Sequence, residues 1–381
     1  MQKRVLLLAS VASMIDQFNM DNIKILQQLG YQVDVACNFL EGNTCSNEKI
    51  QNLKETLNLL SVNYYQIDFT GNVTNIKRDI IAYQQLKKVI SENKYNFIHC
   101  HSPIGGAIGR IIAYVAKTKV IYTAHGFHFY SGAPIKNWMI YYPIEKALSH
   151  YTDILITITL EDYDRARKKL RAKKTRYIPG IGVDTKKFQR SDSIRKEVRE
   201  ELGLKEDDVA FFSVGELNKN KNHRMIIQYL KNINNKNIHY FIVGEGYLKT
   251  ALQRNIDESH MGERIHLLGF RKDIIRLLQA ADVFVLPSLR EGLNVSMMEA
   301  MSNSLPCICN RIRGNTDLIE NGKGGYAIEA SKENEWKRCL FELASDENLR
   351  RKMGEFNRKK IEKFSTDIVN TAMREIYEEI G

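Results

Sequence analysis

The sequence predicts an α/β protein with two doubly wound domains, each built on a parallel sheet. Short apolar runs alternate with segments of helical period along most of the chain, which is typical of parallel strands covered by helices on both faces. The length of 381 residues exceeds what one hydrophobic core usually covers. The pattern breaks in a segment rich in Pro and Gly at 177–184, where we place the linker.

In the first half, helix-period segments at 16–29, 75–92 and 105–117 separate the strand-like runs. These predicted strands are Val5–Ala9, Val33–Cys37, Phe97–Cys100, Val120–Thr123 and Ile154–Ile158. The predicted strands of the second half are Val209–Val214, His239–Val243, Ile265–Leu268, Val283–Leu286, Pro306–Cys309 and Gly325–Ile328. We therefore expect an N-terminal domain over 1–178 and a C-terminal domain over 179–364. The chain ends in helix formers, and we expect the last part, about 365–381, to cross back to the first domain.

Composition indicates a cytoplasmic globular protein. The chain is 43% hydrophobic and 27% charged, and no stretch approaches the roughly 20 apolar residues of a spanning helix. The first apolar run, Val5–Ala9, is too short for the core of a secretory signal. Six cysteines, among them Cys45, show no zinc-type spacing, so we expect reduced packing residues and no metal site.

The net charge of +11 is concentrated in the first half of the chain. Residues 1–178 hold 23 Lys and Arg against 14 Asp and Glu, whereas 179–381 hold 33 against 31. Such an excess suits nucleic acid, an anionic membrane surface or phosphorylated lipids. No groove-reading motif or stacking array is present, so we expect no nucleic acid.

Two segments favour an anionic membrane surface as a partner. Eight cations lie between Arg165 and Arg176, and the segment 136–143 mixes Lys136 with Trp138 and Tyr141. Basic and aromatic segments of this kind can lie on an anionic leaflet, with the aromatic rings inserted. The alternative is a solvated helix face whose aromatic residues pack inside the domain.

Polar residues follow the predicted strands where ligands of parallel sheets bind. His99 and His101 close one strand, and the segments 124–130, 215–222, 244–246 and 288–294 follow others. The carboxyl ends of parallel strands meet at one edge of a sheet, where helix N-termini offer free N–H groups. We therefore expect the functional residues at these edges.

The most specific pattern is the pair of carboxylates Glu291 and Glu299, which flank the start of a predicted helix. A glutamate in the loop can accept hydrogen bonds from sugar hydroxyls, and one inside the helix can bind a ribose diol. The helix N-terminus between them suits phosphate groups. The alternative is a capped surface helix with two solvated glutamates.

This segment resembles the E-x7-E signature of family-4 retaining glycosyltransferases. The resemblance covers most of 205–330, and its frame includes Gly269–Asp273, Ala281–Ser288, Glu291-Gly292, Glu299–Met301 and Gly324-Gly325. In the first half, His99–Pro103 and Tyr122–Tyr130 resemble the bacterial branch that builds capsule and exopolysaccharide repeat units on a lipid carrier.

The resemblance implies a GT-B fold, with two Rossmann-like domains and a deep interdomain cleft. The C-terminal domain would hold the nucleotide-sugar, with Glu299 on the ribose, Glu291 on the hexose and Lys221 on the diphosphate. The implied donor-binding residues are Gly215, Lys219, Lys221, Arg271, Glu291, Gly292, Leu293, Asn294 and Glu299. The implied catalytic residues are His125, Glu291 and Lys221, and the implied acceptor-side residues are His101, His128 and Ser13.

The sequence departs from the family pattern in two loops. Glu216 stands where the family usually has an arginine, and either Lys219 or Arg271 is expected to replace that contact. The loop Ala9–Ile15, which contains Ser13, lacks the glycine pair common in the family.

The resemblance implies a retaining, metal-independent hexosyltransferase without a cofactor. It would move a hexosyl group of N-acetylhexosamine type from a UDP-sugar to a polyprenyl diphosphate-linked saccharide, at the inner face of the cell membrane. A metal-dependent transferase would use an Asp-x-Asp such as Asp162–Asp164, but acids there complement a helix dipole. A nucleotide-sugar epimerase on the same fold and a non-catalytic sugar-nucleotide-binding protein are the alternatives.

Overall fold

The computed structural model describes residues 2–42, 46–69, 76–188, 190–233 and 235–381. The chain forms two compact units. Unit 1 runs from Met1 to Ile181 and includes Asp367–Gly381, and unit 2 is Gly182–Thr366. The division thus falls three residues after the predicted boundary, and the last helix belongs to unit 1.

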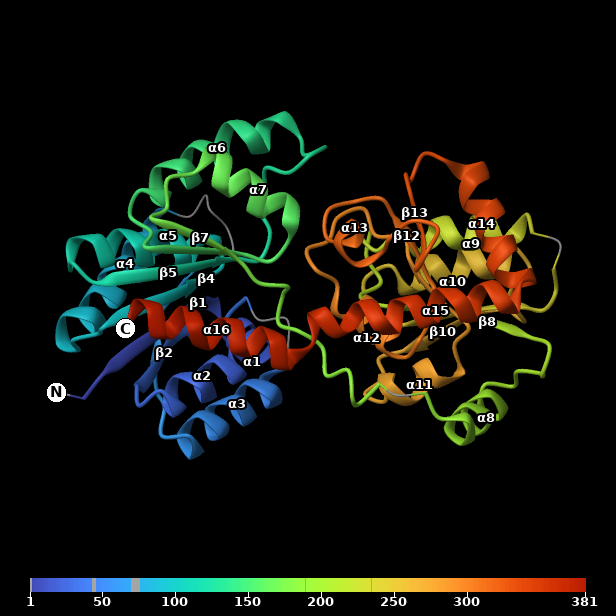
Figure 1. Cartoon of the computed structure of the whole chain (residues 1–381), viewed down its shortest axis with the longest axis horizontal. Coiled ribbons are helices and arrows are strands. Elements are labelled where there is room, and N and C mark those ends of the chain that lie inside the picture. The colour runs from blue at the N-terminus through green and yellow to red at the C-terminus, as the bar shows by residue number, and fades with distance from the viewer. Residues whose placement is uncertain (1, 43–45, 70–75, 189, 234) are drawn as a thin grey trace. The chain divides into compact units, whose positions relative to one another are not determined.

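Unit 1 contains a seven-stranded parallel sheet of order β3-β2-β1-β4-β5-β6-β7 (Figure 1). Its strands are β1 (Arg4–Val11), β2 (Gln32–Asn38), β3 (Asn63–Gln66), β4 (Phe97–His101), β5 (Lys119–Ala124), β6 (Ile154–Thr157) and β7 (Lys174–Tyr177). Its helices are α1 (Ala12–Phe18), α2 (Met20–Gln28), α3 (Asn47–Leu59), α4 (Ile76–Glu92), α5 (Pro103–Val115), α6 (Ile135–Ser149), α7 (Leu160–Lys169) and α16 (Thr366–Ile380).

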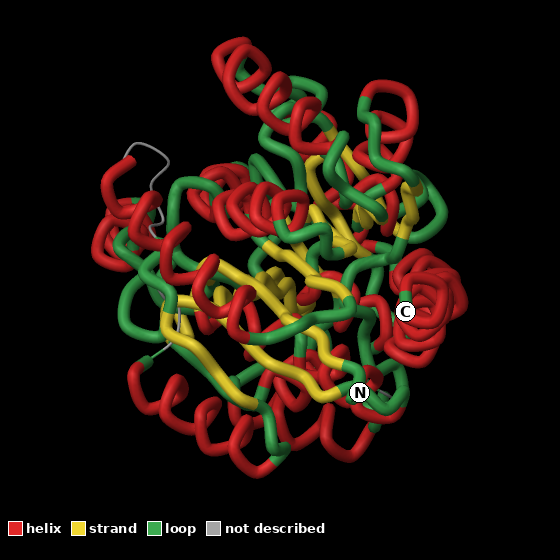
Figure 2. Tube along the Cα trace, turned by 90° about the vertical axis from the view of Figure 1, so that its left-hand side faces the viewer, coloured by secondary structure: helices red, strands yellow, loops and turns green. Residues whose placement is uncertain are grey.

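The strands of unit 1 are buried on both faces because successive side chains point to opposite sides. Val5 and Leu7 belong to a core that includes residues of α2, α3 and α16. Leu6 and Leu8 belong to a second core with residues of α4, α5 and α7. The tube view shows strands with helices on both sides (Figure 2). Because both faces of the sheet are covered, its strands are apolar at successive positions instead of alternating between apolar and polar residues.

Unit 2 contains a six-stranded parallel sheet of order β10-β9-β8-β11-β12-β13. Its strands are β8 (Val209–Val214), β9 (Ile238–Val243), β10 (Ile265–Gly269), β11 (Val283–Leu286), β12 (Cys307–Asn310) and β13 (Gly325–Ile328). Its helices are α8 (Asp192–Glu201), α9 (His223–Lys231), α10 (Lys249–Glu258), α11 (Ile274–Ala280), α12 (Val295–Ser302), α13 (Asn315–Leu318), α14 (Glu333–Ser345), α15 (Glu347–Ile361) and the 3-10 helix η1 (Glu362–Phe364).

The strand order reverses once in each sheet, between β1 and β4 in unit 1 and between β8 and β11 in unit 2. At such a point the loops after the two central strands diverge and leave room for a ligand. The loops after β1, β4, β8 and β11 are therefore the ones that position a site.

The structure differs from the sequence prediction in three places. The short edge strands β3 and β7 were not predicted, because their residues are mostly half-buried or exposed and mostly polar. The predicted helix 16–29 is two helices, interrupted at Asn19, whose buried side chain donates to the Met14 carbonyl at 3.1 Å.

No helix among the described residues is long and apolar enough to cross a membrane. Cys45 lies outside the described residues, and the five described cysteines are buried and free.

Candidate active site

The loop after β8 places Lys221 beside Glu291. The Lys221 Nζ donates to the Glu291 Oε1 at 2.7 Å, and both side chains are largely buried. The backbone N–H of Lys221 donates to the Asn218 side chain at 2.9 Å, which shapes the loop. A Cβ on Gly215 would lie 2.9 Å from the Lys221 Cε. The structure therefore brings together three residues that the resemblance assigned to the donor.

Gly292, Leu293 and Asn294 lead from β11 into helix α12. The Asn294 Oδ1 caps the helix by accepting the Met297 N–H at 2.9 Å. A Cβ on Gly314 would collide with the Gly292 carbonyl oxygen, so the two loops pack backbone against backbone. The N-cap of α12 lies three residues after Glu291 in the chain, and the helix dipole favours negative charge nearby.

Glu299 lies in the second turn of α12, and burial raises the pKa of its carboxyl to about 7. No ion pair to this carboxylate is found within the described residues of unit 2. Since desolvation disfavours the charged form, Glu299 titrates near neutrality unless a ligand donates hydrogen bonds to it. A pKa raised in this way is common at functional sites and is not expected of a solvated helix residue.

The turn Gly244–Gly246 after β9 supports the loop that carries Lys221. Gly244 has φ +146°, and a Cβ there would collide with the Gly215 carbonyl. The Leu217 N–H donates to the Glu245 carbonyl at 2.9 Å. Both glycines therefore allow a close backbone approach, which fixes the loop after β8.

The structure distinguishes between Lys219 and Arg271, the two residues expected to replace an arginine at position 216. Arg271 forms ion pairs with Asp273 at 2.6 Å and with Glu201 at 3.4 Å, and it follows the edge strand β10. Lys219 is exposed in the same loop as Lys221 and Glu216. The two carboxylates already compensate the Arg271 charge, so the geometry favours Lys219 for a diphosphate contact.

Three histidines meet at the ends of β4 and β5 in unit 1. The His101 Nδ1 lies 3.0 Å from the His125 Nε2, and the Phe18 ring contacts His125 edge-on. The His99 and His101 rings are 4.1 Å apart, as expected for alternate residues of one strand. His99 is held on both sides, by the Tyr377 hydroxyl at 2.9 Å and the Thr123 hydroxyl at 2.8 Å.

Burial keeps these histidines neutral. It lowers the pKa of His125 to about 4 and that of His99 to about 3. Burial and the two neighbouring rings lower the pKa of His101 as well. The His101 Nε2 is buried without a hydrogen-bond partner among the described residues. His101 and His125 can therefore exchange hydrogen bonds with an uncharged ligand, whereas His99 has the contacts of a structural residue.

His128 and Ser13 occupy different surroundings from the histidine pair. The His128 ring stacks on Tyr141 at 4.5 Å and lines a cavity beside α6. Ser13 is 3% exposed in the first turn of α1, which begins directly after β1 without a glycine turn. The serine is thus placed at the sheet reversal but is almost covered.

Asp162 has a structural role in the first turn of α7, as its position predicted. Its carboxylate accepts the Phe127 N–H at 3.2 Å and lies 3.5 Å from Arg165. Asp162 is fully buried, whereas Asp164 is exposed. In the parts of the chain that the structure describes, no group of three or more His, Cys, Asp or Glu side chains is arranged to hold a metal ion.

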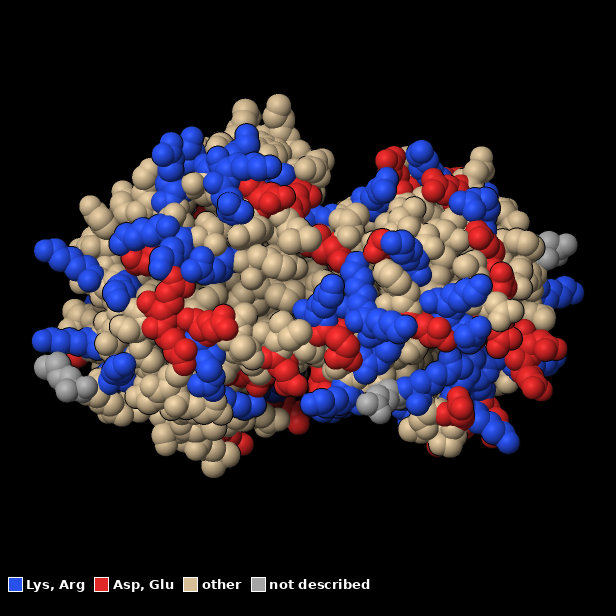
Figure 3. All heavy atoms as spheres, viewed as in Figure 1, with Lys and Arg blue, Asp and Glu red and all other residues tan. Residues whose placement is uncertain are grey.

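The basic run Arg165–Arg176 is not one helix face. Helix α7 ends at Lys169, and Lys174 begins the edge strand β7. Half of its cations form ion pairs within unit 1: Arg165 with Glu161, Lys173 with Asp153, and both Lys174 and Arg176 with Glu379. Figure 3 shows Lys and Arg over the α6–α7 region and also over α15 of unit 2.

The Trp138 side chain packs against other side chains of unit 1. Its ring contacts Phe129 and Tyr142, and the Arg165 guanidinium lies 5.2 Å from its centroid. Trp138 and Tyr141 are half-buried and pack against the core of unit 1, which favours the alternative of packed aromatic residues, and their insertion into a membrane stays a prediction. Helix α6 instead exposes Ile135, Met139, Ile140 and Ile144, which we call the α6 stripe.

Some residues of these sites were missed by sequence reasoning. Tyr377 of α16 and Thr123 of β5 hold His99, and the Arg313 Nη2 donates to the Glu291 carbonyl at 3.4 Å. Tyr377 lies on the apolar face of its helix, which gives it the pattern of a core residue. No sequence signal links it to a histidine 278 positions away.

Two parallel α/β units, each with polar loops at its sheet reversal, form the architecture of the GT-B fold. The family profile described as "Glycosyl transferase 4-like" matches residues 4–159, and the profile "Glycosyl transferases group 1" matches residues 194–360. Together they cover most of both units. The chain therefore belongs to the group 1 glycosyltransferase family and is a glycosyltransferase.

Two relatives support this assignment, and a solved structure has the same fold. EpsD of Bacillus subtilis (strain 168), named as a glycosyltransferase, is 36% identical over 99% of this chain and 97% of its own length. The UDP-Gal:α-D-GlcNAc-diphosphoundecaprenol α-1,3-galactosyltransferase of Escherichia coli is 35% identical over 73% of each chain. Anabaena HepE in complex with UDP has the same fold, with a TM-score of 0.79 at 17% identity over 99% of this chain and 100% of that chain.

Proposed function

We propose that this glycosyltransferase moves a hexosyl group of N-acetylhexosamine type from a UDP-sugar to a polyprenyl diphosphate-linked saccharide. The anomeric configuration is retained, and the product enters a capsule, exopolysaccharide or other cell-surface glycan. Unit 2 holds the donor and unit 1 holds the acceptor. The galactosyltransferase relative, whose printed name includes a UDP-sugar and a diphosphoundecaprenol acceptor, supports both substrate classes.

The observation that carries the donor assignment is the Lys221–Glu291 pair beside the capped N-terminus of α12. In the proposal, Lys221 and the helix dipole stabilise the charge that develops on the leaving diphosphate. Glu291 accepts hydrogen bonds from the hexose, and Glu299 accepts them from the ribose diol. The two positive groups take the part that a metal ion has in other transferases, so the scheme needs neither metal nor cofactor.

His125 is the residue proposed to contact the donor sugar, and His101 orients it. A neutral imidazole can donate or accept a hydrogen bond without attracting a second charge, which suits a sugar hydroxyl. No carboxylate is assigned as a nucleophile. The leaving phosphate accepts the proton of the acceptor hydroxyl as that hydroxyl attacks from the same face, and the protein positions the two reactants.

The test is product analysis with a panel of UDP-sugars, with and without a saccharide-diphosphoundecaprenol acceptor and with EDTA present. We expect UDP release that requires acceptor, survives EDTA and yields an α-linked product by NMR from an α-linked donor. Donor turnover without acceptor would favour the epimerase. An inverted product, or no turnover of any UDP-sugar in the panel, would contradict the proposal.

The proposal includes peripheral attachment to the anionic inner face of the cell membrane, because the acceptor cannot leave the bilayer. The α6 stripe supports this assignment, together with the exposed Lys168, Lys169 and Arg171. Aliphatic side chains at the interface and cations near anionic lipid act together in peripheral binding.

A further inference from the structure

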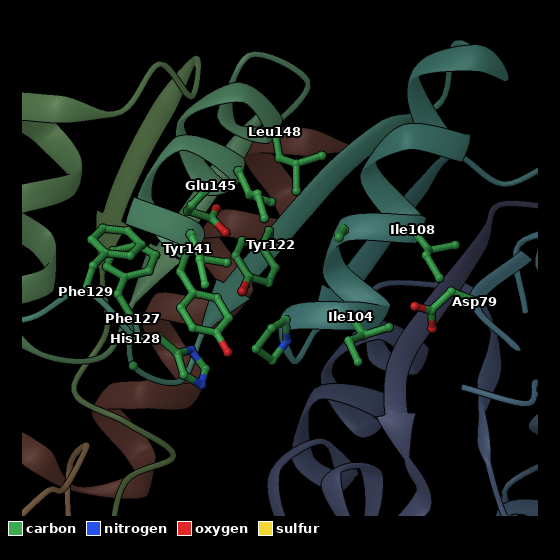
Figure 4. Close-up of a pocket in the computed structure, with 15 residues that line it drawn as sticks. Asp79, Ile104, Ile108, Tyr122, Phe127, His128, Phe129, Tyr141, Glu145 and Leu148 are labelled. Carbon is green, nitrogen blue, oxygen red and sulfur yellow. The ribbon is translucent and has the colours of Figure 1, made fainter. Parts of the chain in front are cut away.

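Unit 1 contains an apolar cavity that the proposed reaction does not use. It has a volume of about 220 Å³ and lies between α5, α6 and the segment after β5. Figure 4 shows Phe127 and Phe129 on one side and Ile104 and Ile108 of α5 on the other, with Tyr141 between them. Because a water in the liquid occupies about 30 Å³, the space equals about seven waters. That volume suits one or two five-carbon units of a ligand.

Two carboxylates line the cavity, Asp79 of α4 and Glu145 of α6, and Glu145 is neutralised by a buried partner. The Glu145 carboxylate accepts two hydrogen bonds from the Arg110 guanidinium, at 2.5 and 3.0 Å. Arg110 is fully buried, donates to the Gly106 carbonyl and lies 4.0 Å from the centroid of the Tyr122 ring. The pair satisfies its own charges, so it offers little attraction to a charged or strongly polar occupant.

The cavity is continuous with exposed apolar surface. Ile140 and Ile144 line the cavity, yet each side chain is about half exposed, at 51%. Ile135 and Met139 extend the same helix surface and are 78% and 68% exposed. Helix α6 also carries the exposed Lys136 and Lys146. A hydrocarbon chain could thus pass from the α6 stripe into the cavity while cations remain near its polar end.

We propose that this cavity binds isoprene units of the lipid-linked acceptor, next to the diphosphate. The inference rests on the proposed function, which supplies a polyprenyl diphosphate as the acceptor anchor. A hydrocarbon occupant fits the lining better than a sugar ring, because a sugar needs several hydrogen-bond partners and the walls are mainly aliphatic and aromatic. His128, at the edge of the cavity beside Tyr141, then lies at the boundary between lipid and saccharide.

The first experiment tests the cavity without any sugar transfer. The probe is farnesyl diphosphate with a diazirine on the hydrocarbon chain, and labelled peptides are located by mass spectrometry. We expect labels on α5 and α6, with competition by undecaprenyl phosphate but not by inorganic diphosphate. Labels confined to other elements, or no protection by the competitor, would overturn the proposal.

Two variants on the same helix sharpen this test. Ala107→Phe fills the cavity, because Ala107 lines it, whereas Ala116→Phe places the same ring on the exposed end of α5. We expect Ala107→Phe to reduce labelling about tenfold, since it removes apolar burial worth about that factor. Ala116→Phe should label like the wild type. Matching thermal melts for the two variants exclude a general loss of folding as the cause.

The second experiment compares acceptors that differ only in the lipid. With a long polyprenyl chain, Ala107→Phe should raise the acceptor KM about tenfold and leave the donor KM unchanged. With a methyl diphosphate-linked saccharide, the variant and the wild type should behave alike. An equal loss with both acceptors would place a sugar in the cavity and refute the lipid assignment. Specific labelling without transfer from any UDP-sugar would support the cavity and contradict the proposed function instead.

Discussion

The sheet edges that carry the candidate site residues have similar topology in the two units, but their side chains are charged in unit 2 and neutral in unit 1. In unit 2, the loops after β8 and β11 present a Lys221–Glu291 ion pair and the carboxyl of Glu299. In unit 1, the ends of β4 and β5 present the histidines His101 and His125, which burial keeps neutral. In the proposed function, the charged groups of unit 2 match the diphosphate of the donor, and the neutral histidines of unit 1 match uncharged sugar hydroxyls.

The physical reason lies in what each ligand requires. A diphosphate needs fixed positive groups, which are most effective when the protein holds them in place before the ligand arrives. A sugar hydroxyl needs hydrogen bonds of defined direction, and a neutral imidazole provides them at a lower desolvation cost than an ion. The predictions below change one side of this comparison at a time.

The largest effect is expected from Lys221→Ala. Removing this cation takes away charge stabilisation of the leaving diphosphate, so kcat should fall about 10²- to 10³-fold. Steady-state UDP release measures the effect, and Lys231→Ala, which removes an exposed cation at the end of α9, is the matched control. Equal activity of Lys221→Ala and the wild type would contradict the donor site.

A somewhat smaller loss, about 10²-fold in kcat, is expected for His125→Ala. His125→Asn should recover part of the activity, because an amide can replace a neutral imidazole as a hydrogen-bond partner. Since the pKa of His125 is about 4, this histidine should produce no change in rate between pH 5 and 8. A titration step near pH 6.5 that disappears in His125→Asn would show that the imidazole is charged and would break the comparison.

The acid limb of the pH profile should belong to Glu299. Its pKa of about 7 means that the ionised form, which accepts the ribose hydroxyls, is lost below neutrality. The kcat/KM for the donor should therefore fall by up to about tenfold per pH unit below pH 7. Glu299→Gln should lower donor affinity at pH 8 and remove this limb. If the acid limb persists in that variant, a group other than Glu299 is responsible for it.

The raised pKa of Glu299 should also make the unfolding free energy depend on pH. A raised pKa means that the folded state binds more protons than the unfolded state between about pH 4.5 and 7, so the unfolding free energy decreases as the pH rises through that window. Glu299→Gln should therefore raise the unfolding free energy of the ligand-free protein at pH 8, by at most about 3 kcal/mol. Chemical denaturation at pH 5 and pH 8 measures it. A variant that is destabilised at pH 8 would mean that the carboxylate has a partner.

The smallest effect concerns the membrane. Changing Ile135 and Met139 of the α6 stripe to Ser should weaken binding to phosphatidylglycerol vesicles several-fold, because exposed aliphatic side chains lose their burial. Lys168→Gln with Lys169→Gln should also weaken binding, by about 1 kcal/mol per charge, and only at low salt. Lys174→Gln is the control, since Lys174 pairs with Glu379. Co-sedimentation that is the same for all of these proteins would rule out both surfaces.

Sequence reasoning identified the two sheets because their central strands contain continuous apolar runs, such as Val5–Ala9 and Val283–Leu286. The edge strands β3 and β7 escaped because one-sided burial leaves short, mostly polar segments. The motif residues Lys221 and Glu291 were found separately, but their mutual pairing depends on the packing of two loops 70 positions apart. Likewise, the Glu201 contact to Arg271 and the Tyr377 contact to His99 arise from tertiary structure alone.

The most direct test of the division between the two units is UDP binding by calorimetry in the absence of acceptor. The account predicts that Lys221→Ala and Glu299→Ala each raise the Kd for UDP about tenfold or more, since they remove contacts to the diphosphate and the ribose. His125→Ala should bind UDP like the wild type, because its imidazole belongs to the uncharged ligand edge. Unchanged affinity in both unit 2 variants, or a loss in His125→Ala alone, would contradict the assignment of the nucleotide to unit 2.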